Sequence, residues 1–207
     1  MANNTQAAQT LLSHQAHTHS ITDVTAIGST LDVKTSLSAG IWVYHANIET
    51  TANATGVKYI LQGSWNTTST VNEDWVDIIT FQTGTVAAVA AEIAGAEAIG
   101  QTQITVDADP TAAFLRGIDI YIEDTGTVTD GEWAKTDHSV AATDVFIVDG
   151  LTVAKDASDT MWTQAEKFYT SVDLGGFQFV RMIMQHTAVT GSNIHFKAEM
   201  VEVTDFA

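Results

Sequence analysis

Cysteine is absent from this chain of 207 residues, and proline occurs once, at Pro110. Without cysteine the chain forms no disulfide, no thiolate metal site and no cysteine nucleophile. Basic residues are also scarce: 8 lysines and arginines face 25 acidic residues, for a formal net charge of −17. Binding to nucleic acid and to anionic membranes depends on lysine and arginine. We therefore expect neither nucleic acid nor a membrane as a partner.

Long apolar runs are missing too. No stretch reaches the ~18 apolar residues of a membrane-spanning helix. Residues 1–20 lack the basic and apolar segments of a secretory signal peptide. They are polar and carry little charge, with Leu11 and Leu12 as their large apolar side chains. The sequence predicts an extended N-terminal arm over 1–20 that orders only against a neighbouring subunit, with a disordered tail as the alternative.

Apolar residues nevertheless make up 45% of the chain, and much of it alternates with a period of two, as β-strands do. The clearest runs are 41–46 and 57–62, and the Thr/Asn-rich linker between them, ending at Gly56, predicts a hairpin. The run 177–185 is apolar on both faces apart from Arg181, which is typical of a central strand. We expect the C-terminal strands to pair with those of 40–83.

The middle of the chain changes character. Residues 84–100 are rich in alanine and predict either a short helix over 86–93 or an extended linker. Residues 96–160 contain short strand patterns, the turn signals Asp130-Gly131 and Asp149-Gly150, and 13 acidic against 3 basic residues. Long strand patterns resume after residue 160.

These patterns predict an all-β fold: an antiparallel β-sandwich, jelly-roll or immunoglobulin-like, with an inserted small β subdomain and an extended N-terminal arm. The predicted parts are the arm at 1–20, a discontinuous main sandwich at 21–95 and 161–207, and the inserted acidic subdomain at 96–160.

Three groups of side chains are candidates for binding. His14, His17 and His19 have the spacing H-x-x-H-x-H, and imidazoles from three copies around a threefold axis could hold a transition metal; a polar arm is the alternative. The other two groups are acidic residues that could in part surround Ca²⁺, or form a solvated face, and tryptophans that could bind sugar, or pack in the core. Their members are Asp107, Asp109, Asp119, Glu123, Asp124, Asp130 and Glu132, and Trp42, Trp65, Trp75, Trp133 and Trp162.

Motifs of enzymes are absent: there is no G-x-S-x-G elbow, no P-loop and no G-x-G-x-x-G. We expect no enzymatic activity and no cofactor.

Several stretches resemble small structural proteins encoded among the virion genes of tailed bacteriophages. They are TLDVKTSLSAGIWVYHANIETTANATGVKYILQGS with DWVDIITFQTGT, then FLRGIDIYIEDTGTVTDGEWAK with VFIVDGLTVAKDASD, and finally FVRMIMQHTAVTGSNIHFKAEMVEV. The resemblance covers about residues 30–203 and contains no catalytic motif. It implies a capsid decoration (cement) protein or another accessory virion component, assembled in the host cytoplasm.

From this resemblance we expect a homotrimer that binds the major capsid protein and bridges capsid subunits. The fragment HTHSITDVT is similar to N-terminal pieces of phage tail-fibre proteins, so a tail or tail-fibre component is the alternative. A carbohydrate-binding β-sandwich module, with Trp65 as its most exposed tryptophan, is a further alternative.

Overall fold

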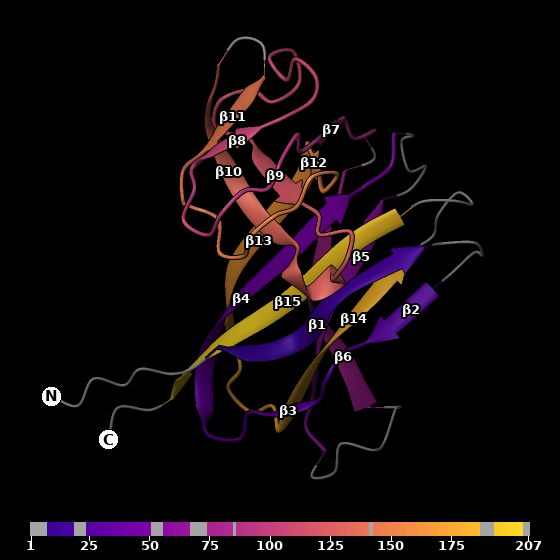
Figure 1. Ribbon diagram of the computed structural model, residues 1–207. Helices are drawn as coiled ribbons and strands as arrows, with labels where there is room; N and C mark the ends of the chain where they lie inside the picture. Colours follow the sequence, from indigo (N-terminus) through magenta and orange to yellow (C-terminus); the bar gives the residue numbers. More distant parts are fainter. Residues whose placement is uncertain are drawn as a thin grey trace, which may run out of the picture.

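Strands and turns make up the protein. The structure, a computed structural model, describes residues 8–18, 24–50, 56–66, 74–84, 86–140, 143–186 and 193–204 (Figure 1). Within these ranges the helical structure is limited to short 3-10 turns, among them η2 (Val128–Asp130). None of the described helical segments is long and apolar enough to cross a membrane. The predicted all-β fold is confirmed.

Two antiparallel sheets form a sandwich. Sheet A has the strand order β1-β15-β4-β13, and sheet B has the order β2-β14-β5-β6, with β3 also paired to β14. The strands of sheet A are β1 (Gln9–Thr18), β15 (Asn193–Thr204), β4 (Ser36–Asn47) and β13 (Gln164–Asp173). Those of sheet B are β2 (Val24–Ile27), β14 (Phe179–His186), β5 (Val57–Ser64), β6 (Trp75–Gln82) and β3 (Leu31–Asp32).

The strands pair from both ends of the chain inwards. β1 pairs with β15, β2 with β14, β4 with β13, and β5 with β6. The chain is thus one long antiparallel ribbon, rolled so that most consecutive strands lie in opposite sheets. This winding is that of the jelly-roll alternative rather than the immunoglobulin-like one. The expected pairing of the C-terminal strands with those of 40–83 is confirmed.

One hydrophobic cluster fills the space between sheets A and B. β14 lies between β2 and β5 as a central strand, as predicted, and its Val180, Met182 and Met184 are fully buried. Each buried aliphatic side chain contributes about 1.5–3 kcal/mol. The cluster takes side chains from both halves of the chain, among them Leu11, Ile41, Val43, Tyr59, Leu61, Phe196 and Met200.

The structure corrects the prediction of an N-terminal arm. Residues 9–18 form β1, an edge strand that pairs with β15 of the same chain. Leu11 and Leu12 are 0% and 2% exposed and belong to the main core. Irregular pairing between Thr10 and Gln15 lets both neighbouring leucines be buried, which strict alternation forbids. Residues 1–7, 19 and 20 of the predicted arm lie outside the described residues.

The predicted hairpin between 41–46 and 57–62 is wrong. β4 lies in sheet A and β5 in sheet B, so the intervening segment crosses from one sheet to the other. Both strands are long and largely buried, and each gains two paired neighbours as a central strand of its own sheet. Residues 51–55 of the linker lie outside the described residues.

The alanine-rich stretch is extended, so of the two alternatives the helix over 86–93 is wrong. It contributes β7 (Ala90–Glu92), and Ile93 pairs with Val106 as an isolated bridge. The Ala88 N–H donates to the Glu49 carbonyl, which ties the segment to the sandwich.

A third sheet of six strands stands at one end of the sandwich (Figure 1). It has its own hydrophobic cluster, which includes Phe114, Ile120 and Met161. Sheet C has the order β7-β12-β9-β10-β11-β8. Its remaining strands are β12 (Thr160–Trp162), β9 (Asp119–Ile122), β10 (Glu132–Val140), β11 (Asp144–Ile147) and β8 (Gln103–Thr105).

Sheet C runs from Ala90 to Trp162, so it includes β7, which lies outside the predicted segment 96–160, and all of β12. The chain leaves the sandwich after β6, forms sheet C and returns to the sandwich at β13. We call residues 90–162 the subdomain. That the segment folds independently stays a prediction.

Candidate functional site

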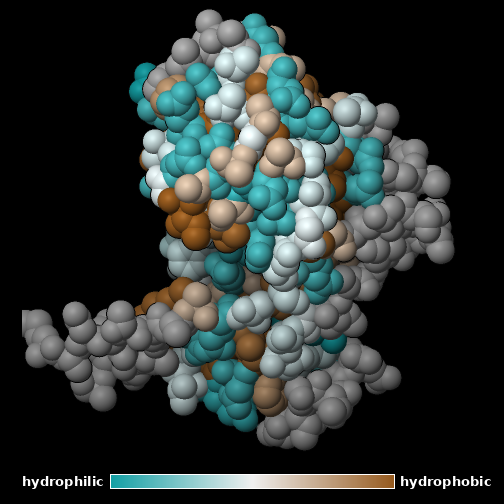
Figure 2. Space-filling model, in the orientation of Figure 1, coloured by the Kyte–Doolittle hydropathy of each residue, from teal (hydrophilic) through white to brown (hydrophobic). Residues whose placement is uncertain are grey.

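A cleft of about 550 Å³ lies where the third sheet meets sheet A. The space-filling view shows the surface recessed where the subdomain meets the sandwich (Figure 2). The cleft is lined by Thr10, Leu12, Ser13, His14, Tyr44, Thr129, Asp130, Gly131, Glu132, Trp133, Thr152, Val153, Lys167, Lys197 and Glu199.

Strand register places an aromatic ring between two lysines on the floor of the cleft. Tyr44 of β4 lies opposite Lys197 of β15 on one side and opposite Lys167 of β13 on the other. The Lys197 Nζ is 4.6 Å from the centre of the Tyr44 ring, close enough for a cation–π contact. The Trp133 ring of β10 is 5.6 Å from Tyr44, so the two rings together form a bent aromatic floor.

The lysines of the cleft are paired with acids. Lys197 Nζ lies 3.3 Å from Glu199 Oε1, and Lys167 Nζ lies 3.8 Å from Asp119 Oδ1. Lys155, whose side chain is fully buried behind the wall, lies 3.8 Å from Glu132 Oε1 and donates to the Asp130 carbonyl. Three of the eight basic residues therefore gather here, each with its own carboxylate.

A polar junction between the subdomain and sheet A adjoins the cleft and shares His14 with its lining. The Tyr121 hydroxyl lies 2.7 Å from His195 Nδ1 and 3.1 Å from His14 Nε2. Gly131 passes so close that a Cβ atom there would come within 2.0 Å of this hydroxyl. The Trp133 indole N–H donates to the His45 carbonyl at 3.0 Å, which orients the ring that the cleft exposes.

Burial sets the protonation states at this junction. It lowers the pKa of His195 to about 4, with a smaller contribution from His14, and it lowers the pKa of His14 as well. Both imidazoles are therefore neutral at neutral pH. Glu123 Oε1 lies 3.8 Å from His195 Nε2, and burial raises the Glu123 pKa, so this pair is not a strong ion pair.

The three predicted histidines are not assembled into a site that the structure describes. His14 faces Tyr121 and Trp133. His17 lies in β1, and His19 lies outside the described residues. Within the described ranges, no three His, Asp or Glu side chains meet in an arrangement suited to a metal ion. The trimeric metal site stays untested.

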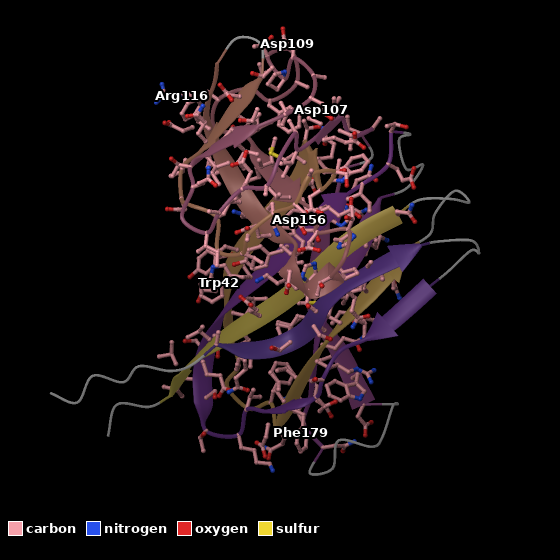
Figure 3. The ribbon with its side chains drawn as sticks, in the orientation of Figure 1. Trp42, Asp107, Asp109, Arg116, Asp156 and Phe179 are labelled. Carbon is pink, nitrogen blue, oxygen red and sulfur yellow. The ribbon has the colours of Figure 1, made fainter. Side chains whose placement is uncertain are left out.

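The acidic candidates are scattered and serve local contacts. Asp107 and Asp109 lie at the far end of the subdomain (Figure 3), where Asp109 accepts hydrogen bonds from Thr111. Asp124 accepts the N–H groups of Gly126 and Thr127 in a turn. Of the others, Asp119 and Glu132 pair with lysines, Glu123 accepts the indole N–H of Trp162, and Asp130 lines the cleft.

The five tryptophans divide between packing and exposure. Trp75 packs against Arg181, whose guanidinium lies 4.2 Å from the centre of its ring. Trp133 and Trp162 pack at the junction, and Trp42 lies 4.9 Å from Tyr169 on the outer face of sheet A (Figure 3). Trp65 is 56% exposed, as the sequence predicted for the most exposed of the set.

Sequence reasoning missed Tyr44, Lys167 and Lys197 as a group. Tyr44 stood in a recognised strand, but its facing lysines are more than 120 residues away, and only the register brings the three together. The signal present in the sequence was the placing of single lysines within strands otherwise rich in aromatic residues, at 167–169 and 195–197.

No family model matches the chain, and a comparison with curated proteins finds no similar sequence. Among solved structures, the chain is similar to the Gt strain of infectious bursal disease virus, with 10% identity, 98% of this chain and 43% of that chain covered, and a TM-score of 0.23. The chain is also similar to the VP2 subviral particle of the same virus, with 10% identity and a TM-score of 0.24. That match covers 98% of this chain and 43% of the other. The chain thus spans less than half the length of these structures. TM-scores of this size establish neither a shared fold nor a shared function, so the jelly roll rests on the strand pairing alone.

Proposed function

We propose that this chain is a structural protein of a tailed-phage virion that decorates the capsid and stabilises it by bridging capsid subunits. The sequence stretches that resemble virion proteins support the proposal. The jelly roll supports it by analogy only, because viral capsid and lectin domains both use this architecture. The role proposed is non-enzymatic.

The observation that supports attachment is a group of aromatic side chains at the end of the sandwich opposite the subdomain. Trp65 and Phe177 stack there with ring centres 4.8 Å apart and planes at 28°. Gly63 of β5 makes room for this stack, because a Cβ atom there would come within 2.5 Å of the Phe177 ring. An exposed tryptophan whose ring is already held by a stacking partner is typical of the residues that anchor protein interfaces.

Cations sit over neighbouring rings at the same end. The Arg181 guanidinium lies 4.2 Å from the centre of the Trp75 ring, and Lys34 Nζ lies 4.9 Å from that of Phe179. Tryptophan, phenylalanine and arginine are enriched in the cores of protein interfaces. We call this surface the aromatic end; it comprises Lys34, Trp65, Trp75, Phe177, Phe179 and Arg181.

Figure 3 places Phe179 at one end of the molecule and Asp109, at the tip of the acidic subdomain, at the other. Docking through the aromatic end would point the subdomain away from the shell. Each copy that binds only the mature shell stabilises that state by mass action. Assembly as a homotrimer would multiply weak contacts by raising the effective concentration of each.

Cryo-electron microscopy of purified particles tests the location. Density for the chain at junctions between major capsid subunits is expected, with the subdomain outermost. Density confined to the tail would overturn decoration and favour a tail component.

Attachment is tested separately by adding purified protein to undecorated particles. Trp65→Ala should lower occupancy strongly, because it removes the exposed anchor. Tyr169→Ala is the matched control, since Tyr169 is 63% exposed on sheet A and lies outside the aromatic end. Equal occupancy for Trp65→Ala and the unmodified protein would refute docking through this end.

A further inference from the structure

We propose that the cleft between sheet A and the subdomain is a binding site for a neutral saccharide. This goes beyond attachment to a capsid, because the cleft lies away from the aromatic end and shares no residue with it.

Two aromatic side chains that could contact a pyranose ring line the cleft. The rings of Tyr44 and Trp133 lie side by side there, with their planes inclined at 53°. Aromatic faces carry partial negative charge, so they attract the weakly positive C–H groups of a sugar. Both rings are fixed before any ligand arrives, Trp133 by its hydrogen bond to the His45 carbonyl and Tyr44 by its place in β4, between β15 and β13.

The walls provide hydrogen-bonding groups of both kinds. Thr10, Ser13, Thr129 and Thr152 bring hydroxyls, which both donate and accept. Lys167 and Lys197 donate, and Glu132 and Glu199 accept. A sugar hydroxyl likewise donates one hydrogen bond and accepts others. A wall that carries both donors and acceptors therefore suits it better than a wall that carries only one of the two.

Glu132 is held in place by contacts within the wall. Its Oε2 accepts hydrogen bonds from the backbone and the hydroxyl of Thr152. Its Oε1 is buried and lies 3.8 Å from the Nζ atom of the buried Lys155. The wall of the cleft is therefore fixed before any ligand arrives.

Charge and size select the class of ligand. The cleft is lined by three carboxylates, Asp130, Glu132 and Glu199, and by two lysines, Lys167 and Lys197, so its lining has a net charge of −1. A charge this small attracts neither a cation nor an anion strongly, although the whole chain carries −17. A volume of about 550 Å³ lies within the usual range of small-ligand sites and suits one or two sugar rings.

An array of immobilised oligosaccharides tests the proposal. It should include neutral chains of glucose, galactose, mannose, rhamnose and N-acetylglucosamine, together with sialylated and sulfated chains. Binding to at least one neutral chain is expected. Binding to no chain, or only to charged ones, would overturn the proposal.

Variants then locate the site. Tyr44→Ala should weaken binding at least about tenfold, whereas Tyr44→Phe should retain it, because the ring remains. Thr129→Tyr leaves the floor intact and fills the cleft from an exposed position, so it should also abolish binding. This second variant keeps the test decisive if Tyr44→Ala does not fold.

Trp65→Ala is the control, because it removes an exposed tryptophan at the aromatic end. It should bind glycan normally while losing capsid occupancy, and Tyr44→Ala should show the reverse. Glycan binding that survives both Tyr44→Ala and Thr129→Tyr, or that is lost in Trp65→Ala, contradicts a site in the cleft.

Discussion

Tyr121 and His195 join the two hydrophobic units of the chain through a buried hydrogen bond of 2.7 Å. Tyr121 belongs to β9 of the subdomain, and His195 belongs to β15 of the sandwich. The same hydroxyl contacts His14 of β1, so one oxygen atom links three strands. The junction is therefore a specific contact that fixes how the subdomain stands on the sandwich.

Tyr121→Phe should destabilise the protein by about 1–3 kcal/mol, because it leaves the buried Nδ1 of His195 and the partly buried Nε2 of His14 without the hydroxyl. The ring and its packing are kept. Denaturant unfolding measures the change. Tyr169→Phe is the control and should lie within about 0.5 kcal/mol of the unmodified protein, since that side chain is exposed. Equal losses in the two variants would show that the hydroxyl has no special role.

Acid should destabilise the protein through His195. Its pKa is about 4 in the folded protein and about 6.5 when unfolded, so the unfolded chain binds more protons between these values. Stability is then fully present above pH 6.5 and falls by roughly 3 kcal/mol as the pH drops to 4. The lowered pKa of His14 acts in the same direction, and the raised pKa of Glu123 acts in the opposite one.

Comparison with His195→Gln isolates this contribution. The variant cannot titrate at position 195, so its unfolding midpoint should depend less on pH between 6.5 and 4. Parallel pH profiles for the two proteins would contradict the assignment.

Removing residues 1–18 should destabilise the isolated protein severely, in contrast to the behaviour of a free arm. Leu11→Ala alone should cost about 2–5 kcal/mol, because the side chain is fully buried between the sheets. Thr10→Ala, at an exposed position in the same strand, is the control. Thermal unfolding measures both, and an unchanged melting temperature for Leu11→Ala would mean that β1 does not contribute to the core.

The subdomain should be removable at Val89 and Thr163. These residues lie side by side, since the Thr163 N–H donates to the Val89 carbonyl and the Val89 N–H donates to the Thr163 hydroxyl. Replacing residues 90–162 by a short Gly-Ser linker should leave a sandwich that unfolds cooperatively, though less stably, because Ala46 and His195 lose their cover. Circular dichroism during thermal unfolding tests this. A non-cooperative transition would mean that the sandwich needs the subdomain in order to fold.

The strands could be predicted from the sequence, but most of their partners could not. The run 177–185 is apolar on both faces, and β14 is a central strand, as predicted. Such a pattern reports whether the faces of a strand are buried. It does not report which strand lies alongside, so 41–46 and 57–62 were assigned to one hairpin although they lie in different sheets. Leu11 and Leu12 were assigned to a free arm because a strand with a period of two cannot bury two neighbouring side chains. The irregular pairing of β1 with β15 allows both to be buried.

The winding of the ribbon has a consequence for synthesis. Gln9 pairs with Met200, so β1 finds its partner only after all the residues between these two strands have been synthesised. Sheet C needs only residues 90–162, and its strands can pair while β13, β14 and β15 are still being made. Pairing between distant strands is slow to form. The subdomain should therefore fold before the sandwich. Its two ends are held together beside Val89 and Thr163, which would bring the flanking strands of the sandwich closer to one another.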